Sequence, residues 1–179
     1  MKSSVDDEDI MVEAPRVYEC ELKGTRLRCE VVTATTSEAL IEFCHENPDA
    51  KVLVRYPRGQ HNSKLWRQRV EQTMHVYMSE TFEITKLELS KLLNRFYHFN
   101  PYMAKKGRME EKLSEVWDPI GLITIYIVKL RERDTVKNLK TAKQFIRSSF
   151  DTMHILHTSD NQKETLYFAE HIWPTLSPN

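Results

Sequence analysis

Glycine is scarce in this chain of 179 residues, which contains only Gly24, Gly59, Gly107 and Gly121. A Walker-type phosphate loop needs two glycines just before a Lys-Ser/Thr pair, and no segment of the chain supplies them. The chain also lacks a Cys-x-x-Cys pair, a His-Glu-x-x-His sequence and a Gly-x-Ser-x-Gly sequence. These absences exclude P-loop nucleotide hydrolases, thioredoxin-type redox proteins, helical zinc proteases and serine hydrolases of the elbow type.

The chain has no excess of charge and no long apolar run. Its 26 Lys and Arg residues equal its 26 Asp and Glu residues, so the overall field gives no reason to expect nucleic acid or an acidic membrane as a partner. No apolar stretch of about 18 residues occurs, and the acidic first residues do not resemble a signal peptide. We therefore expect a cytoplasmic protein with neither nucleic-acid nor membrane partners.

The composition divides the chain into three parts. Residues 1–14 combine carboxylates with little apolar surface, which predicts a disordered acidic tail. For residues 15–49 the sequence predicts a hairpin followed by a helix that begins after Thr35 or Thr36. Residues 50–175 alternate between strand and helix patterns and predict the main domain.

The hairpin is predicted over residues 16–33, around a two-residue turn at Gly24-Thr25. Three cysteines and the lack of an Asn-x-Ser/Thr sequon fit a reducing compartment. A pair of thiols is therefore favoured over a disulfide where two cysteines face each other, although a disulfide there is conceivable. The predicted cross-strand pairs are Leu22/Leu27, Cys20/Cys29 and Tyr18/Val31 on one face and Glu21/Arg28 on the other.

The pattern of the main domain predicts a ferredoxin-like α/β sandwich with a mainly antiparallel sheet, because strand-helix-strand units occur on either side of a helical segment. Strands are predicted at Val52–Tyr56, from Phe82, at 120–128 and at 152–157. We expect Val52–Tyr56 and Leu122–Val128 to lie in the interior of one sheet, with the last strand beside Val52–Tyr56. Helices are predicted at Ser63–Met78, from Thr85 or Ser90, from Met109, from Asp134 or Thr135, and from Ser159 or Asp160 to about His171.

The last predicted strand delivers a histidine to the start of a helix. Alternation along residues 152–157 would place His154 and His157 on opposite faces, so a metal pair is not expected. A helix N-terminus favours negative charge. An imidazole beside it therefore suggests phosphoryl chemistry.

This region resembles the nucleoside diphosphate kinases. That family has an Arg in a Thr-Ile-Arg-like segment, then Asn-x-x-His-Gly-Ser-Asp, then a helix that closes on two aromatic residues and Pro. Arg147, residues 157–160 and residues 172–174 occupy these positions without a gap after His157. Upstream, residues 52–59 resemble the first strand of the family and its Lys-Pro-Asp-Gly end. Tyr97 resembles the active-site Tyr, and Pro119 resembles the Pro of the Gly-Pro before the third strand. Residues 136–140 resemble the Val-x-x-x-Arg segment. The resemblance covers roughly residues 50–175 and favours Ser90 over Thr85 as the helix cap.

The chain also departs from the family at positions that carry chemistry. A longer nucleotide-gripping loop is absent, because Lys140 and Arg147 are close together in sequence. Phosphoryl transfer depends on positioning and charge neutralisation, so these losses argue against efficient turnover. The replacements are Tyr56 for the Lys before Pro, Arg58 for Asp, His154 for Asn, Thr158 for Gly, and Phe168 for the Glu that orients the histidine.

Two functions follow from this comparison. The first is a non-catalytic interaction or scaffold module without a cofactor, as in the divergent relatives of this family that are built into ciliary axonemes. Its contact surface is expected at the hairpin-helix unit, near Phe43 and the strand edge at Val31-Val32. The alternative is an active phosphotransferase that uses nucleotide with magnesium and carries phosphate on His157. The resemblance then gives Lys140, Arg147, Tyr97 and Ser159 phosphate- or nucleotide-binding roles.

Overall fold

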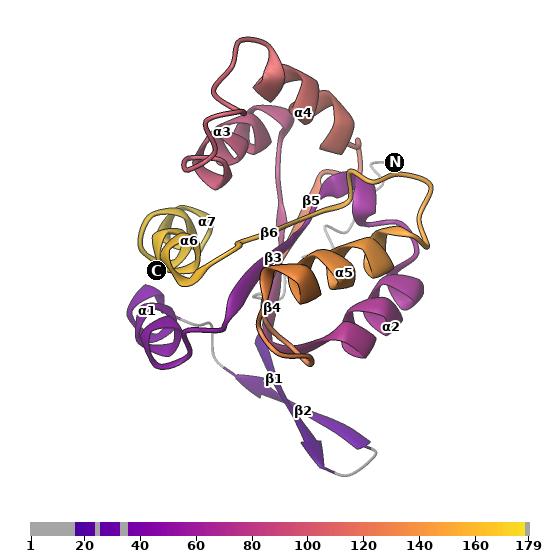
Figure 1. Cartoon of the computed structure of the whole chain (residues 1–179), viewed down its shortest axis with the longest axis vertical. Coiled ribbons are helices and arrows are strands. Elements are labelled where there is room, and N and C mark those ends of the chain that lie inside the picture. The colour runs from indigo at the N-terminus through magenta and orange to yellow at the C-terminus, as the bar shows by residue number, and fades with distance from the viewer. Residues whose placement is uncertain (1–16, 24–25, 33–35, 178–179) are drawn as a thin grey trace, which may run out of the picture.

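The computed structural model describes residues 17–23, 26–32 and 36–177 of the chain. Figure 1 shows one sheet between two layers of helices, with a separate hairpin at one end. The strands are β1 (Val17–Lys23), β2 (Arg26–Val32), β3 (Lys51–Arg55), β4 (Met74–Glu83), β5 (Leu122–Leu130) and β6 (Leu156–Thr158). The helices are α1 (Ser37–Glu46), α2 (Ser63–Thr73), α3 (Lys86–Phe96), α4 (Arg108–Val116), α5 (Val136–Arg147), α6 (Gln162–Tyr167) and α7 (Trp173–Leu176), with a 3-10 turn η1 (Pro57–Gly59) and a π-helical turn η2 (Phe168–Ile172).

The main sheet has the strand order β4-β5-β3-β6, and each neighbouring pair is antiparallel. The units β3-α2-β4 and β5-α5-β6 are each split by a strand of the other unit, which is the ferredoxin-like arrangement. The predicted α/β sandwich is therefore confirmed. As predicted, β3 and β5 are the inner strands and β6 lies beside β3. None of the helices in the described part of the chain has both the length and the apolar character that a membrane crossing requires.

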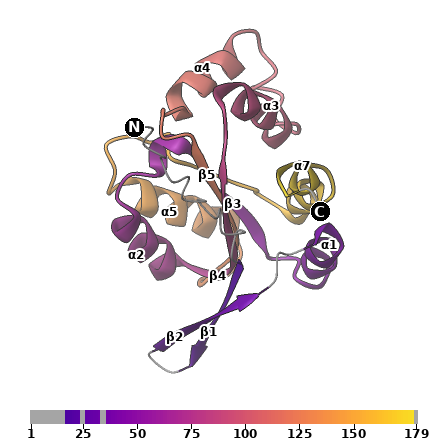
Figure 2. The ribbon, with the colours of Figure 1, turned by 180° about the vertical axis from the view of Figure 1, so that it is seen from behind.

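Strand β3 supplies residues to two hydrophobic cores. Val52 and Val54 pack with α1, α3 and the C-terminal helical turns, whereas Leu53 packs with α2 and α5. Figure 2 shows these two helical layers from behind, with α2 and α5 together on one side of the sheet. All five residues of β3 are buried. Each buried Val or Leu contributes roughly 1.5–3 kcal/mol relative to exposure, so β3 is central to the stability of the domain.

The hairpin β1-β2 has the predicted register and forms a sheet of its own. β1 lies close to β4 at one end of the main sheet (Figures 1 and 2). The helix after it is capped by Thr36, whose Oγ1 accepts a hydrogen bond from the Ala39 N–H at 3.2 Å. The predicted acidic tail, the turn at residues 24–25 and Thr35 lie outside the described residues. The register pairs Cys20 with Cys29, Leu22 with Leu27, Tyr18 with Val31, and Glu21 with Arg28.

The boundary between α2 and β4 was predicted incorrectly. The helix ends at Thr73 and the strand starts at Met74, whereas the sequence predicted a helix to Met78 and a strand from Phe82. Apolar residues here fit a helical spacing, and the alternation typical of a strand is interrupted by Glu80. Glu80 occupies an inward-facing position between Met78 and Phe82, so the strand pattern is hidden in the sequence.

The cap of α3 also differs from the preferred prediction. Thr85 Oγ1 accepts a hydrogen bond from the Glu88 N–H, and the Glu88 carboxylate accepts one from the Thr85 N–H. This is a complete capping box. The preference for Ser90 was therefore wrong, because the local signal at Thr85 was stronger than the family pattern.

The last strand is shorter than predicted. β6 has only three residues, so His154 precedes it. The cap of α6 is Asn161, whose Oδ1 accepts from the Glu164 N–H at 3.0 Å, and neither Ser159 nor Asp160 caps the helix. The Ser159 hydroxyl instead accepts a hydrogen bond from the Val52 N–H and shares one with the Thr165 hydroxyl.

Glu80 is a buried carboxylic acid inside the sandwich. The residue is 3% exposed, and neither carboxylate oxygen has a hydrogen-bond partner among the described residues. Burial raises the pKa of Glu80 above its ordinary value. Burial of an unpaired charge is unfavourable, so ionisation of Glu80 opposes folding.

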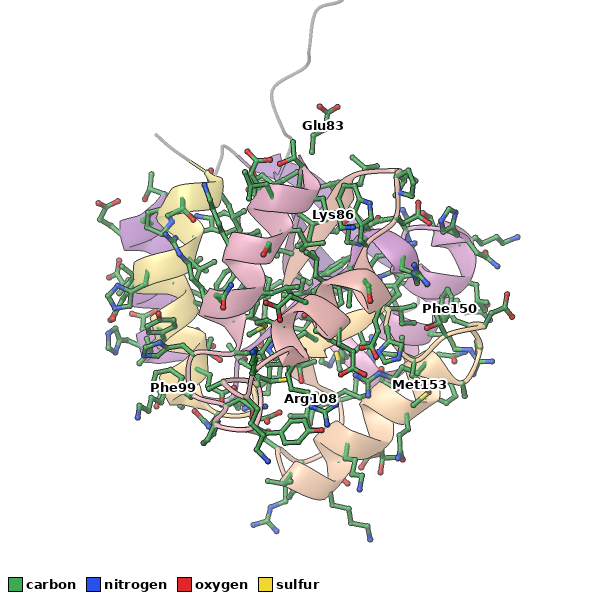
Figure 3. All side chains as sticks on the ribbon, turned by 90° about the horizontal axis from the view of Figure 1, so that it is seen from above. Glu83, Lys86, Phe99, Arg108, Phe150 and Met153 are labelled. Carbon is green, nitrogen blue, oxygen red and sulfur yellow. The ribbon has the colours of Figure 1, made fainter. Side chains whose placement is uncertain are left out.

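We predict that Glu80→Gln stabilises the protein at mildly alkaline pH. Because the folded pKa is raised, the folded state is most stable when Glu80 is protonated, and stability falls as pH rises through the folded pKa. The variant should unfold about 2–4 °C higher than wild type near pH 8, for a gain of roughly 1 kcal/mol, with a smaller difference near pH 5. Glu83→Gln, at the exposed end of β4 that projects in Figure 3, is the control. A gain that does not depend on pH in a thermal melt would contradict the assignment.

Candidate functional site

His157 is the central residue of β6 and lies opposite Val54 of β3. Its ring stacks on Phe96, with centroids 6.0 Å apart and planes inclined by 16°, and meets the Tyr97 ring edge-on at 4.8 Å. Phe96 stacks in turn on Phe168, at 6.1 Å. Phe168 holds the position where the kinase family has its orienting Glu. An aromatic stack therefore surrounds the histidine where the family has a carboxylate.

Burial strongly affects the charge of His157. Burial and, to a smaller extent, the cations Lys143, Lys112 and Arg147 together lower the pKa of the imidazole to about 3. His157 is therefore neutral at physiological pH. A neutral imidazole has the lone pair that a nucleophile needs, but the stacked rings restrict the approach of a substrate to it.

The cavity next to His157 is small. Its volume is about 20 Å³, which is close to the space that one water molecule needs. The lining is mostly apolar, and the cavity cannot admit a phosphoryl group without movement of the surrounding rings. It is lined by Val52, Val54, Phe96, Phe99, Phe168 and Ile172, and by the polar residues Arg95, His157, Ser159, Glu164 and Tyr167.

Tyr97 and Arg147 lie near His157, as the resemblance predicted. Burial raises the pKa of both Tyr97 and Tyr56, and each phenol acts on the other. The Tyr56 side chain is completely buried, and the Tyr97 hydroxyl is the side-chain group that interacts with its hydroxyl. Arg147 donates from Nη2 to the Leu156 carbonyl at 3.2 Å, and burial lowers its pKa. Arg147 thus fixes the start of β6 while its charge acts on both phenols.

Lys140 and Ser159 do not join this group. Lys140 is exposed on α5, and the nearby Lys143 is the α5 lysine that acts on the pKa of His157. The buried Ser159 hydroxyl accepts from the Val52 N–H at 2.9 Å and shares a hydrogen bond with Thr165 at 2.8 Å. Its contacts are therefore those of a residue that joins β3 to α6.

The start of α6 has its own hydrogen-bond partners. The Asp160 N–H donates to the Glu164 carboxylate at 2.8 Å, and the Glu164 N–H donates to the Asn161 side chain at 3.0 Å. Protein groups thus occupy backbone donors that were expected to receive a phosphate.

Lys112 is a residue of the site that sequence reasoning missed. It comes from α4, and its Nζ lies 5.8 Å from the centre of the Tyr56 ring and 3.5 Å from His154 Nδ1. Burial lowers the pKa of Lys112, and Glu115 opposes this shift. Glu115 Oε2 also lies 3.1 Å from His154 Nδ1. Lys112 therefore places a cation beside the position where the family has Lys and this chain has Tyr56.

The turn η1 holds the end of β3 against the segment before β6. The Tyr56 N–H donates to the Ile155 carbonyl at 2.9 Å. A Cβ atom at Gly59 would lie 2.7 Å from that same carbonyl oxygen, so only glycine fits without a shift of the backbone. This contact keeps Tyr56 and His157 on neighbouring, rigid segments.

No protein-family model and no curated protein matches this chain. Within the described ranges, no group of three or more His, Cys, Asp or Glu side chains is arranged to hold a metal ion. The resemblance to nucleoside diphosphate kinases therefore stays a prediction from residues 50–175.

We predict that His157 does not titrate in the range where histidines usually do. Its folded pKa lies below the ordinary value, so the unfolded state binds the extra proton first, and stability is lost as pH falls below about 6.5. A titration of imidazole ¹⁵N shifts should show one ring that stays neutral from about pH 8 to pH 5, and His157→Gln should remove that signal. The variant should also lose less stability than wild type between those pH values. Protonation of His157 near pH 6.5 would contradict the prediction.

Proposed function

We propose that this protein is a catalytically degenerate nucleoside diphosphate kinase-like domain that acts as a cytoplasmic interaction or scaffold module. The carrying observation is the partial aromatic enclosure of His157, whose side chain is half-buried, by Phe96, Tyr97 and, one ring further, Phe168. A phosphate carrier needs an accessible nucleophile and an orienting partner. The enclosure supports a packing role for His157 instead. We further propose a large cytoskeletal assembly, such as a ciliary axoneme, as the setting.

The energetic cost of the replacements supports this proposal. Loss of one preorganised donor to a developing charge typically costs about 2.7–4 kcal/mol, or roughly 100–1,000-fold in rate. Tyr56 cannot supply the charge of the family Lys, and Phe168 cannot fix the tautomer of His157. The two losses act on the same step, so the residual rate would be very low.

One observation favours an active phosphotransferase as the second candidate. Lys112 and Arg147 place two cations near Tyr56, and burial lowers the pKa of each. In this alternative Lys112 compensates for the missing Lys, magnesium enters with the nucleotide, and the Phe96 ring moves away from His157. No cofactor is needed in the favoured proposal.

The proposed partner is another protein, and the proposed contact lies at the hairpin. Phe43 was expected to contact a partner, but its ring packs edge-on against Tyr77 with centroids 5.0 Å apart and joins the core. The strand edge of β2 remains as the candidate. Unpaired strand edges present backbone donors and acceptors to another chain.

We predict no phosphohistidine on this protein. Incubation of the whole chain with magnesium and γ-³²P-labelled nucleoside triphosphate should give no acid-labile, base-stable label above background, because His157 is enclosed. His157→Ala and His154→Ala should give the same background. A label in wild type and His154→Ala that His157→Ala abolishes would establish the alternative function.

A further inference from the structure

Strand β2 is the free edge of the hairpin. Within the described residues, β2 pairs with β1 only, and β1 rather than β2 lies close to β4. Both views in Figures 1 and 2 show the hairpin extending from the end of the main sheet. A two-stranded sheet is at best marginally stable alone, so a further strand on the β2 side would stabilise it.

The register of the hairpin leaves one charge unbalanced on β2. Glu30 lies directly opposite Glu19, and like charges at opposite register positions are destabilising. A basic residue at the neighbouring position on the other side of Glu30 would offset this repulsion. β2 itself contains such a residue, Arg28, which is two positions from Glu30 and therefore on the same face of the strand.

We propose that two copies of this chain associate through antiparallel pairing of their β2 strands about a twofold axis at Cys29. In this register, position 28 of each copy lies opposite position 30 of the other, so Arg28 and Glu30 form two complementary pairs. Leu27 lies opposite Val31 of the second copy, and the two Cys29 positions face each other. The proposal rests on the proposed function, in which the hairpin and not the His157 pocket is the contact surface.

Other registers fit the sequence less well. An axis at position 28 places Arg28 opposite Arg28 of the second copy, and an axis at position 30 places Glu30 opposite Glu30. An axis between two residues pairs charged with apolar positions, because a shift of one residue exchanges the two faces of a strand. The axis at position 28 also pairs Arg26 with Glu30, but it keeps the Arg28 repulsion at its centre. The axis at Cys29 leaves Arg26 opposite Val32, and it is the one of these that gives opposite-charge and apolar pairs without a like-charge pair.

A charge-exchange experiment tests this register. Arg28→Glu and Glu30→Arg should each weaken self-association by at least about tenfold, because two favourable pairs become two repulsive pairs. An equimolar mixture of the two variants should restore it, since each mixed pair again joins Glu with Arg. Sedimentation velocity of the full chain at about 10–100 µM measures the dimer fraction in each case.

Glu19→Arg is the matched control, because it makes the same change of charge at the position opposite Glu30 but on β1. It should weaken self-association much less than Glu30→Arg does, because position 19 does not pair with the second copy. A wild-type chain that stays monomeric at about 100 µM, or a mixture that dimerises no better than the single variants, would overturn the proposal. Neither result bears on phosphohistidine formation, so the proposed lack of catalysis stands or falls separately.

Cysteine cross-linking covers the case in which a charge variant fails to fold. In a Cys20→Ser, Cys44→Ser chain, Cys29 should form an intermolecular disulfide on mild oxidation, because directly opposite strand positions are within disulfide range. In the matched Cys29→Ser, Cys44→Ser chain, Cys20 should not. Equal cross-linking through Cys20 and Cys29 would overturn the register.

Discussion

The pairing of β3 with strands on both of its sides is the constraint on which the rest of the structure depends. β3 is buried along its whole length, gives residues to both cores, and pairs with β5 and β6. Just beyond β3, the Tyr56 N–H donates to the Ile155 carbonyl, and just beyond β6, the Ser159 N–H donates to the Val52 carbonyl. These contacts attach β6 firmly although the strand has only three residues. The position of His157 is therefore set by β3.

The same packing that fixes His157 also partly encloses it, because its side chain is half-buried. A residue on β6 that faces the α3 side must fill space between the sheet and the helices, and the imidazole does so among Phe96, Tyr97 and Phe168. Burial then keeps the ring neutral. The cations Lys112 and Arg147 remain close by, so the region has the charges of an anion site and the packing of a core. On our account the packing determines the function.

The inner strands and the hairpin register could be predicted from sequence, because residues 52–56 and 120–128 are nearly continuous apolar runs and the hairpin residues alternate around a two-residue turn signal. β4 could not be predicted to its full length, because Glu80 places a carboxyl group at an inward position. In the site, His157, Tyr97 and Arg147 come together as the family resemblance implied. Lys112 could not be predicted, since its place depends on how α4 packs over the end of β3. That packing has no local sequence signal.

The most direct test of our account is the accessibility of His157 in the native protein. Diethyl pyrocarbonate modifies exposed imidazoles, and mass spectrometry of the digested protein gives the rate at each histidine. We expect rapid modification of His61 and His171, whose side chains are 62% and 58% exposed. His157, which is half-buried and stacked on Phe96, should be modified much more slowly than these two until the protein is unfolded. Modification of His157 at a rate similar to His61 in the folded chain would contradict the enclosed site and favour an active phosphotransferase.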